Sequence, residues 1–161
     1  NAATLVLGKA EDGDLSNNGY VSKRPDYYKL HYGNGINDEC LSRIFGMRFL
    51  CDYLVSLHRE KTEEIHVRNL LIRTLKMFER ILQGHGELGC SPNSSEEFAG
   101  HLRLMAGCCI IKLATQNVFA GCVTPEQLVL VGSLIHDELR FVRRRILGKL
   151  AKHLNSIKLP V

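Results

Sequence analysis

The sequence contains none of the short motifs that usually accompany catalysis. It has no glycine-rich phosphate loop, no G-x-S-x-G, no H-E-x-x-H and no pair of carboxylates on an otherwise apolar face. The seven histidines are scattered singly along the chain. His153 falls on the apolar side of the last expected helix, where a hydrogen-bonded core histidine is commoner than a ligand or a base. The sequence therefore predicts a protein that is not an enzyme and that carries no cofactor.

Targeting and membrane-spanning segments are also absent from the sequence. The 161-residue chain has no secretory signal and no apolar run that approaches the roughly 20 residues of a membrane span. It opens on Asn1 rather than on an initiator methionine. We expect a soluble segment of a longer protein, with enough residues for one cored domain.

Cysteine occurs six times, but no C-x-x-C pair is present and four of the six lie inside expected helices. We therefore expect reduced, mostly buried thiols in an intracellular protein. His85, Glu87 and Cys90 stand near one another on a glycine-rich stretch. They lack a convincing fourth ligand, so we predict no metal site.

One sequence pattern occurs twice at a spacing of 40 residues, and in each copy the apolar residues recur with the period of a helix. The copies are Leu102-Arg103 followed by Ala106, Ile110 and Ala114, and Val142-Arg143 followed by Ile146, Leu150 and Leu154. An acid stands six residues before each arginine, Glu97 before Arg103 and Asp137 before Arg143. Arg143 falls within the apolar arc of its helix, so we expect both arginines to be mostly buried. Each should bond an acid or a carbonyl near the start of its own repeat.

A period near 40 residues with two helices per unit is typical of a HEAT-repeat α-solenoid, which is an all-α fold. Apolar spacing and capping residues predict five helices near residues 37–58, 63–83, 95–116, 125–136 and 138–157, with consecutive helices antiparallel. Ser94-Ser-Glu-Glu97 fits a capping box, and Thr124-Pro125 with Gln127 fits another. The helix near 63–83 is apolar on more than one face, so we expect neighbours to cover it on two sides.

The chain is expected to fall into two parts. Residues 1–36 are a helix tail ending at Gly8 and then an irregular insertion loop. Tyrosines and basic residues between positions 20 and 32 of that loop pack against the scaffold or contact a partner or a nucleic acid. Residues 37–161 form about two and a half HEAT-type repeats of a longer solenoid.

Positive charge is concentrated at the C-terminal end. Residues 137–161 hold seven lysines and arginines against two acids, a net of +5 in a chain whose total is +4. The outer arc of the last helix combines these charges with a small residue, in the set Arg140, Arg144, Arg145, Gly148 and Lys152. Three interpretations stay open: a solvated face, a face that stacks on a further repeat, or a groove for an acidic peptide or for phosphates.

Three stretches carry a family resemblance. They are the run from Leu102 to Ala114, the phrase Val123-Thr-Pro-Glu-Gln-Leu128, and His136-Asp-Glu138 with Val142-Arg143. Together they resemble the cohesin-associated "precocious dissociation of sisters" (Pds) regulators of sister-chromatid cohesion. The match is close over residues 101–159 and looser over 38–88. Val123 and His136 stand where the family phrase has Ile and Asn, and the run 143–145 is more basic than the family pattern.

The resemblance implies a hook-shaped HEAT-repeat scaffold that binds the cohesin ring through its kleisin subunit. It also implies a platform for cohesin-release and protection factors, a place in the nucleus on chromosomes, and no enzymatic activity. Contact with chromatin would be indirect, and no membrane or small-molecule substrate is implied. The alternative is a nucleic-acid-binding α-solenoid that uses the basic C-terminal helix. A transport or armadillo-like adaptor would explain the solenoid but not the Thr-Pro-Glu-Gln phrase.

Overall fold

The structure, a computed structural model, describes residues 36–59, 64–84, 86 and 95–155. The chain divides into two units, Asn1–Ile36 and Asn37–Val161, and every helix discussed below belongs to the second. The helix tail and insertion loop expected before Ile36 lie outside the described residues.

The described residues form helices and no strand, which confirms the all-α class. The elements are α3 (Asp38–Arg59), α4 (Glu64–Gln83), α5 (Glu96–Ala114), α6 (Asn117–Ala120), α7 (Pro125–Ser133), the 3₁₀ turn η1 (Leu134–His136) and α8 (Arg140–Asn155). The five expected helices are present, with two differences. The short helix α6 separates α5 from α7, and the last turn of the fourth expected helix tightens into η1.

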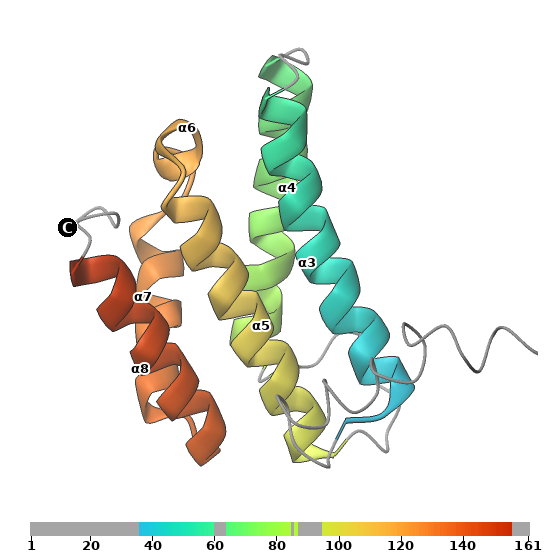
Figure 1. Ribbon diagram of the computed structural model, residues 1–161, viewed down its shortest axis with the longest axis vertical. Helices are drawn as coiled ribbons and strands as arrows, with labels where there is room; N and C mark the ends of the chain where they lie inside the picture. Colours follow the sequence, from blue (N-terminus) through green and yellow to red (C-terminus); the bar gives the residue numbers. More distant parts are fainter. Residues whose placement is uncertain (1–35, 60–63, 85, 87–94, 156–161) are drawn as a thin grey trace, which may run out of the picture. The chain divides into compact units, whose positions relative to one another are not determined.

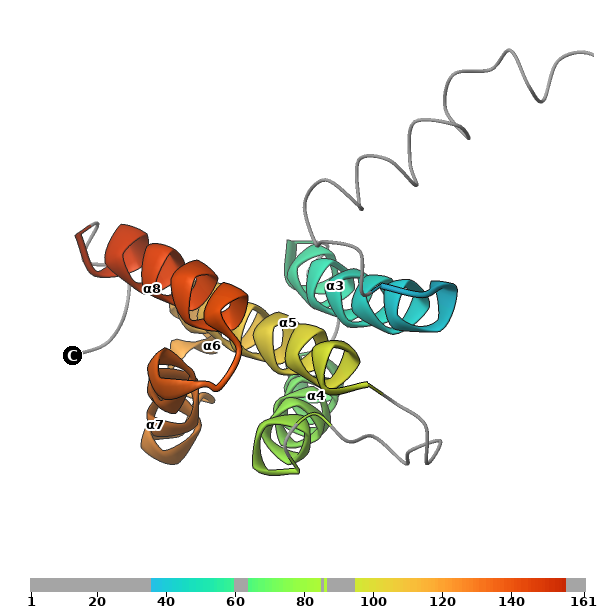
Figure 2. The same ribbon diagram turned by 90° about the horizontal axis from the view of Figure 1, so that it is seen from below.

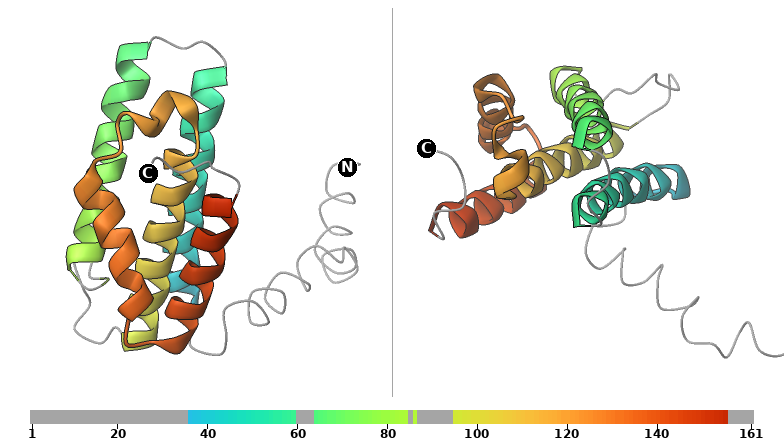
Figure 3. Two further views of the ribbon diagram at one scale, coloured as in Figure 1. Left: turned by 90° about the vertical axis from the view of Figure 1, so that its left-hand side faces the viewer. Right: turned by 90° about the horizontal axis from the view of Figure 1, so that it is seen from above.

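The helices of this unit lie in two layers (Figure 2). α3, α5 and α8 lie side by side in one layer, and α4 and α7 form the other, as Figure 3 also shows. The chain alternates between the layers, and the colours in Figure 1 show that consecutive long helices run antiparallel. Stacked antiparallel helix pairs of this kind are the HEAT-repeat arrangement.

α5 is the central helix of the unit. It contacts α3, α4, α6, α7, η1 and α8, and its buried residues surround most of its circumference. A helix that is apolar all round must be covered on all sides, which explains its position. The sequence predicts neighbours on two sides of α4, and α4 does contact α3, α5 and α7, but its cover is incomplete. α4 buries one stripe, while Ile65 and Ile72, which share a face at a spacing of seven, are 66% and 37% exposed.

Two glycines of α5 allow its neighbours to approach closely. A Cβ added at Gly100 would collide with the side chain of Leu139, and one at Gly107 would collide with that of Leu134. The glycines are seven residues apart and therefore share one face of α5. Val142, which is fully buried, packs from α8 toward the same face.

The helix starts follow from capping chemistry. The hydroxyl of Thr124 accepts from the backbone N–H of Gln127 at 3.3 Å, and the Gln127 side chain accepts from the Thr124 N–H at 3.1 Å. This reciprocal pair confirms the capping box expected there. α5 is capped by Ser95, whose hydroxyl accepts from the N–H of Phe98 at 3.2 Å. The cap of α5 is thus one residue later than the predicted Ser94-to-Glu97 box requires.

Candidate protein-interaction surface

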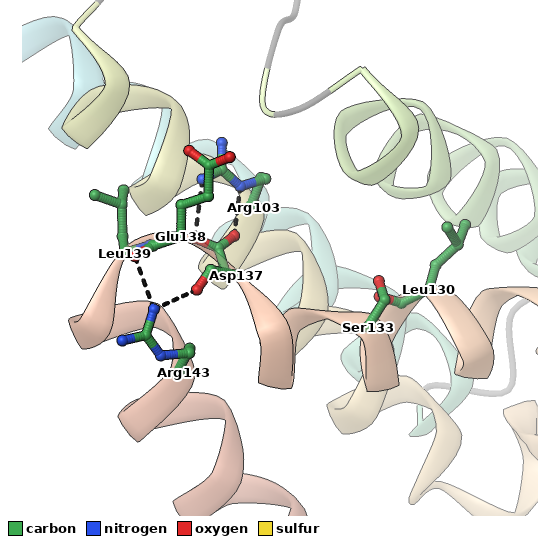
Figure 4. A network of polar contacts seen from close by, with 7 residues as sticks. All are labelled: Arg103, Leu130, Ser133, Asp137, Glu138, Leu139 and Arg143. Carbon is green, nitrogen blue, oxygen red and sulfur yellow. Dashed lines mark hydrogen bonds and ion pairs between the residues drawn. The ribbon is translucent and has the colours of Figure 1, made fainter.

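A buried arginine in α5 is held by an acid from the turn before α8. Arg103 is 8% exposed. Its Nε donates to Oδ2 of Asp137 at 2.7 Å, and its Nη2 donates to Oδ1 at 3.0 Å (Figure 4). The Asp137 side chain is 4% exposed, so both partners of this two-pronged ion pair are largely removed from water. Such charge-assisted pairs are short and strongly directional.

Asp137 organises the turn as well as the ion pair. Its Oδ1 accepts from the backbone N–H of Leu139 at 2.9 Å. Burial would raise the pKa of Asp137, but hydrogen bonds from Arg103 and Leu139 and the charges of Arg103 and Arg143 outweigh burial and lower it. The carboxylate therefore stays ionised at neutral pH and keeps its bonds.

Arg143 closes the same turn from inside α8. Its Nη1 donates to the backbone carbonyl of Asp137 at 2.6 Å and to that of Glu138 at 2.7 Å (Figure 4). The arginine is half-buried, one step beyond the fully buried Val142. Arg143 thus bonds carbonyls at the start of its own helix, which is the kind of partner expected for it, but it is less buried than expected.

Glu97 does not take the role that the sequence repeat suggested. It is exposed in the first turn of α5, and the carboxylate that binds Arg103 is that of Asp137, 34 residues later. The reason is helical geometry. Both Glu97 and Arg103 lie in α5, and residues six apart on one helix do not share a face. Asp137 lies in a turn, so its side chain can face a neighbouring helix.

Apart from Arg143, the lysines and arginines of α8 are exposed, and they divide between two faces of the helix. Arg140 and Arg144 are four residues apart and share a face with Leu147 and Leu154, which are 46% and 54% exposed. Arg145 lies on the other side together with Lys149 and Lys152, at spacings of four and three. Gly148 lies between the two faces, and its surroundings are open.

Two neutral side chains lie beside this second basic face. His101 is buried and stacks on Phe141 with ring centroids 4.4 Å apart. Burial and, to a lesser degree, the charge of Arg145 lower the pKa of His101 to about 4. The half-buried thiol of Cys108 has its pKa raised by burial. Both groups are uncharged at neutral pH, so they do not cancel the positive charges of α8.

Within the described ranges, no group of three or more His, Cys, Asp or Glu side chains is placed to hold a metal ion. No described helix combines the length and apolarity needed to cross a membrane. Five cysteines of the described part, Cys40, Cys51, Cys108, Cys109 and Cys122, are free thiols.

Comparison with known proteins identifies the family. Residues 15–161 match the family model described as sister chromatid cohesion protein PDS5. Sister chromatid cohesion protein PDS5 homolog A of Mus musculus is 29% identical over 126 residues, which are 78% of this chain and 9% of the mouse protein. The Homo sapiens homolog A is 28% identical over the same shares. PDS5 homolog B of Gallus gallus is 35% identical over 88 residues, 55% of this chain and 6% of that protein.

The chain thus spans about a tenth of the length of these relatives. Because the family model covers nearly the whole chain, including α3 to α8 and the Arg103–Asp137 pair, the chain belongs to the PDS5 family of sister chromatid cohesion proteins.

Proposed function

We propose that this chain is part of a non-enzymatic HEAT-repeat scaffold that regulates sister-chromatid cohesion. The observation that carries the proposal is the family match over residues 15–161. The relatives that match are named for sister chromatid cohesion. Stacked helix pairs expose long faces along which partner segments can bind, which is how solenoids usually act.

The partners we propose are the cohesin kleisin subunit and factors that release or protect cohesin. The scaffold then works in the nucleus, on chromosomes, and touches chromatin through cohesin. On α8 the contact residues are Arg140, Arg144, Arg145, Gly148 and Lys152, which meet an acidic protein segment or an adjoining repeat. The charges and the two exposed leucines of this helix support both possibilities.

The first test is a pull-down from nuclear extract with the full-length parent protein as bait. We expect cohesin subunits to be recovered with it. Recovery of no cohesin subunit, at a salt concentration where the bait stays folded and soluble, would refute the proposed function.

A charge reversal tests the face of α8 that carries Arg140 and Arg144. The variant Arg140→Glu with Arg144→Glu should keep the fold, because both side chains are exposed, and should weaken recovery of cohesin subunits. A matched control is Arg73→Glu with Lys76→Glu, which makes the same change of charge on exposed positions of α4. Normal cohesin recovery together with loss of a steeply salt-dependent affinity for DNA would instead favour the nucleic-acid alternative.

A further inference from the structure

Positive side chains from two helices converge on the thiol of a third. Arg48 of α3 and Arg145 and Lys149 of α8 are all exposed. Burial raises the pKa of the Cys108 thiol in α5, whereas the charges of Lys149, Arg145 and Arg48 act on the same sulfur in the opposite direction. The packing agrees with this. The thiol of Cys109 donates to the carbonyl of Met47 at 3.8 Å. Ile146 lies against Gly107. Arg48 and Arg145 therefore come from the turns of α3 and α8 that pack beside Cys108.

The arrangement of the layer explains this convergence. α5 lies between α3 and α8 in one layer (Figure 2), so these two helices flank the face of α5 that points away from α4 and α7. Cys108 and Lys112 of α5 reach this face, whereas His101 and Met105, earlier on the same side of the helix, are buried. At the α3 side, Lys112 forms an ion pair with Asp52. We call Arg48, Cys108, Lys112, Arg145 and Lys149 the Cys108 surface.

The positive charge of this surface is poorly balanced by its own helices. α8 has no acid between Arg140 and Asn155, and α5 has none after Glu97. Asp52 of α3 is near, and Lys112 already binds it. A ligand that brings carboxylates therefore meets an excess of positive charge.

We propose that the Cys108 surface is a docking site for an acidic segment of a partner polypeptide, which lies across α8, α5 and α3. The inference rests on the proposed scaffold function in one respect, namely that the ligand is part of a protein. It adds Arg48, Cys108, Lys112 and Lys149 to the contact set, and it extends the contact on the Arg145 side of α8 across α5 to α3.

The size of the surface favours a peptide over duplex DNA. Packed helix axes lie about 8–10 Å apart, so three neighbouring helices span roughly 20 Å between the outer axes. An extended chain rises about 3.3 Å per residue, so about six residues cross that distance. Proteins that bind duplex DNA commonly make about 6–10 phosphate contacts. The Cys108 surface offers only four cations, around an uncharged thiol.

The test measures binding of a fluorescein-labelled peptide of ten glutamates to the full chain by fluorescence anisotropy. Arg145→Glu with Lys149→Glu should weaken binding about tenfold or more, because two attractive charges become repulsive. The matched control, Arg73→Glu with Lys76→Glu on α4, should bind like the wild type. Equal losses in both variants would show a response to net charge alone and overturn the proposal. Selective loss of affinity for a 20-base-pair duplex, with peptide binding unchanged, would overturn it in favour of nucleic acid.

A second measurement uses the wild-type chain and does not depend on how a variant folds. Iodoacetamide alkylation of Cys108, followed by mass spectrometry, should slow several-fold when the glutamate peptide is bound. Cys122 is also half-exposed and lies between α6 and α7, so its alkylation rate should not change. If the alkylation rate of Cys108 does not change at saturating peptide, the peptide binds elsewhere and the proposal is refuted.

The inference and the proposed function fail in different ways. If Arg145→Glu with Lys149→Glu does not change cohesin recovery by the parent protein, the docking site is refuted and the proposed scaffold function stands. If the peptide binds at Cys108 but the parent protein recovers no cohesin subunit, the docking site is supported and the proposed function is refuted.

Discussion

Replacing Arg103 by alanine should be among the most damaging single changes in α5. The substitution leaves the carboxylate of Asp137, which is 4% exposed, without the two guanidinium bonds of 2.7 Å and 3.0 Å. Removing one partner of a buried ion pair usually costs about 3–5 kcal/mol, mostly because the other charge is left buried. For a chain of this size each kcal/mol lowers the melting temperature by roughly 2–4 °C. We therefore expect a fall of about 10 °C.

The assay is urea unfolding, followed by circular dichroism, at pH 7 and at a pH well below 3.8, the ordinary pKa of an aspartate. Hydrogen bonds and nearby arginines lower the pKa of Asp137 despite its burial, so its contribution is present at neutral pH and is lost as the pH falls through the folded-state pKa. The penalty of Arg103→Ala should shrink at low pH, because a protonated Asp137 carries no charge. Adding Asp137→Asn should recover part of the loss. The reasoning is refuted if Arg103→Ala unfolds at the wild-type urea concentration.

Three further predictions concern neighbouring positions. Arg143→Ala leaves two backbone carbonyls without their donor, so it should lower the free energy of unfolding by about 1–2 kcal/mol. Arg144 is exposed, so Arg144→Ala should change that free energy by less than about 0.5 kcal/mol. Equal urea midpoints for the two variants would contradict this. Burial lowers the pKa of His101 to about 4, below its unfolded value, so stability conferred by the neutral ring is lost as the pH falls from about 6.5 to about 4. His101→Gln should flatten that part of the profile, and an unchanged profile would argue against a buried neutral ring. Lys149→Gln should raise the pKa of Cys108 further and slow its alkylation at pH 8.5, measured by mass spectrometry; an equal or faster rate would mean that Lys149 lies away from the thiol.

Local signals in the sequence predicted the helices well. The Thr124 capping box depends on residues three positions apart, so its geometry follows from the sequence alone. The 40-residue repeat predicted the all-α solenoid, because the spacing of its apolar residues indicates which face of each helix is buried. The sequence did not reveal that one apolar face of α4 is left exposed, because residues such as Ile65 indicate a face that can be covered but not whether a neighbour is present.

The site was less predictable because it depends on contacts between helices. The sequence repeat identified Arg103 and Asp137 as structural residues but predicted the wrong partners for them. It paired each arginine with the acid six positions before it in the chain. Only the packing of α8 on α5 brings the two together across 34 positions. The same holds for Arg48, which nothing in the sequence links to α8, and for the division of the α8 cations between two faces. Rotation of a helix about its own axis relative to its neighbours is set by packing.

The ion pair between Arg103 and Asp137 also bears on how the solenoid unfolds. Its partners come from successive copies of the 40-residue unit, so its energy belongs to the interface between the units rather than to either one. In a linear array the ratio of interface energy to intrinsic energy sets whether neighbours melt together. Weakening this ion pair should widen the range of denaturant concentrations over which α3 and α4 unfold separately from α7 and α8. Under tension along the array, the junction before α8 would then open first.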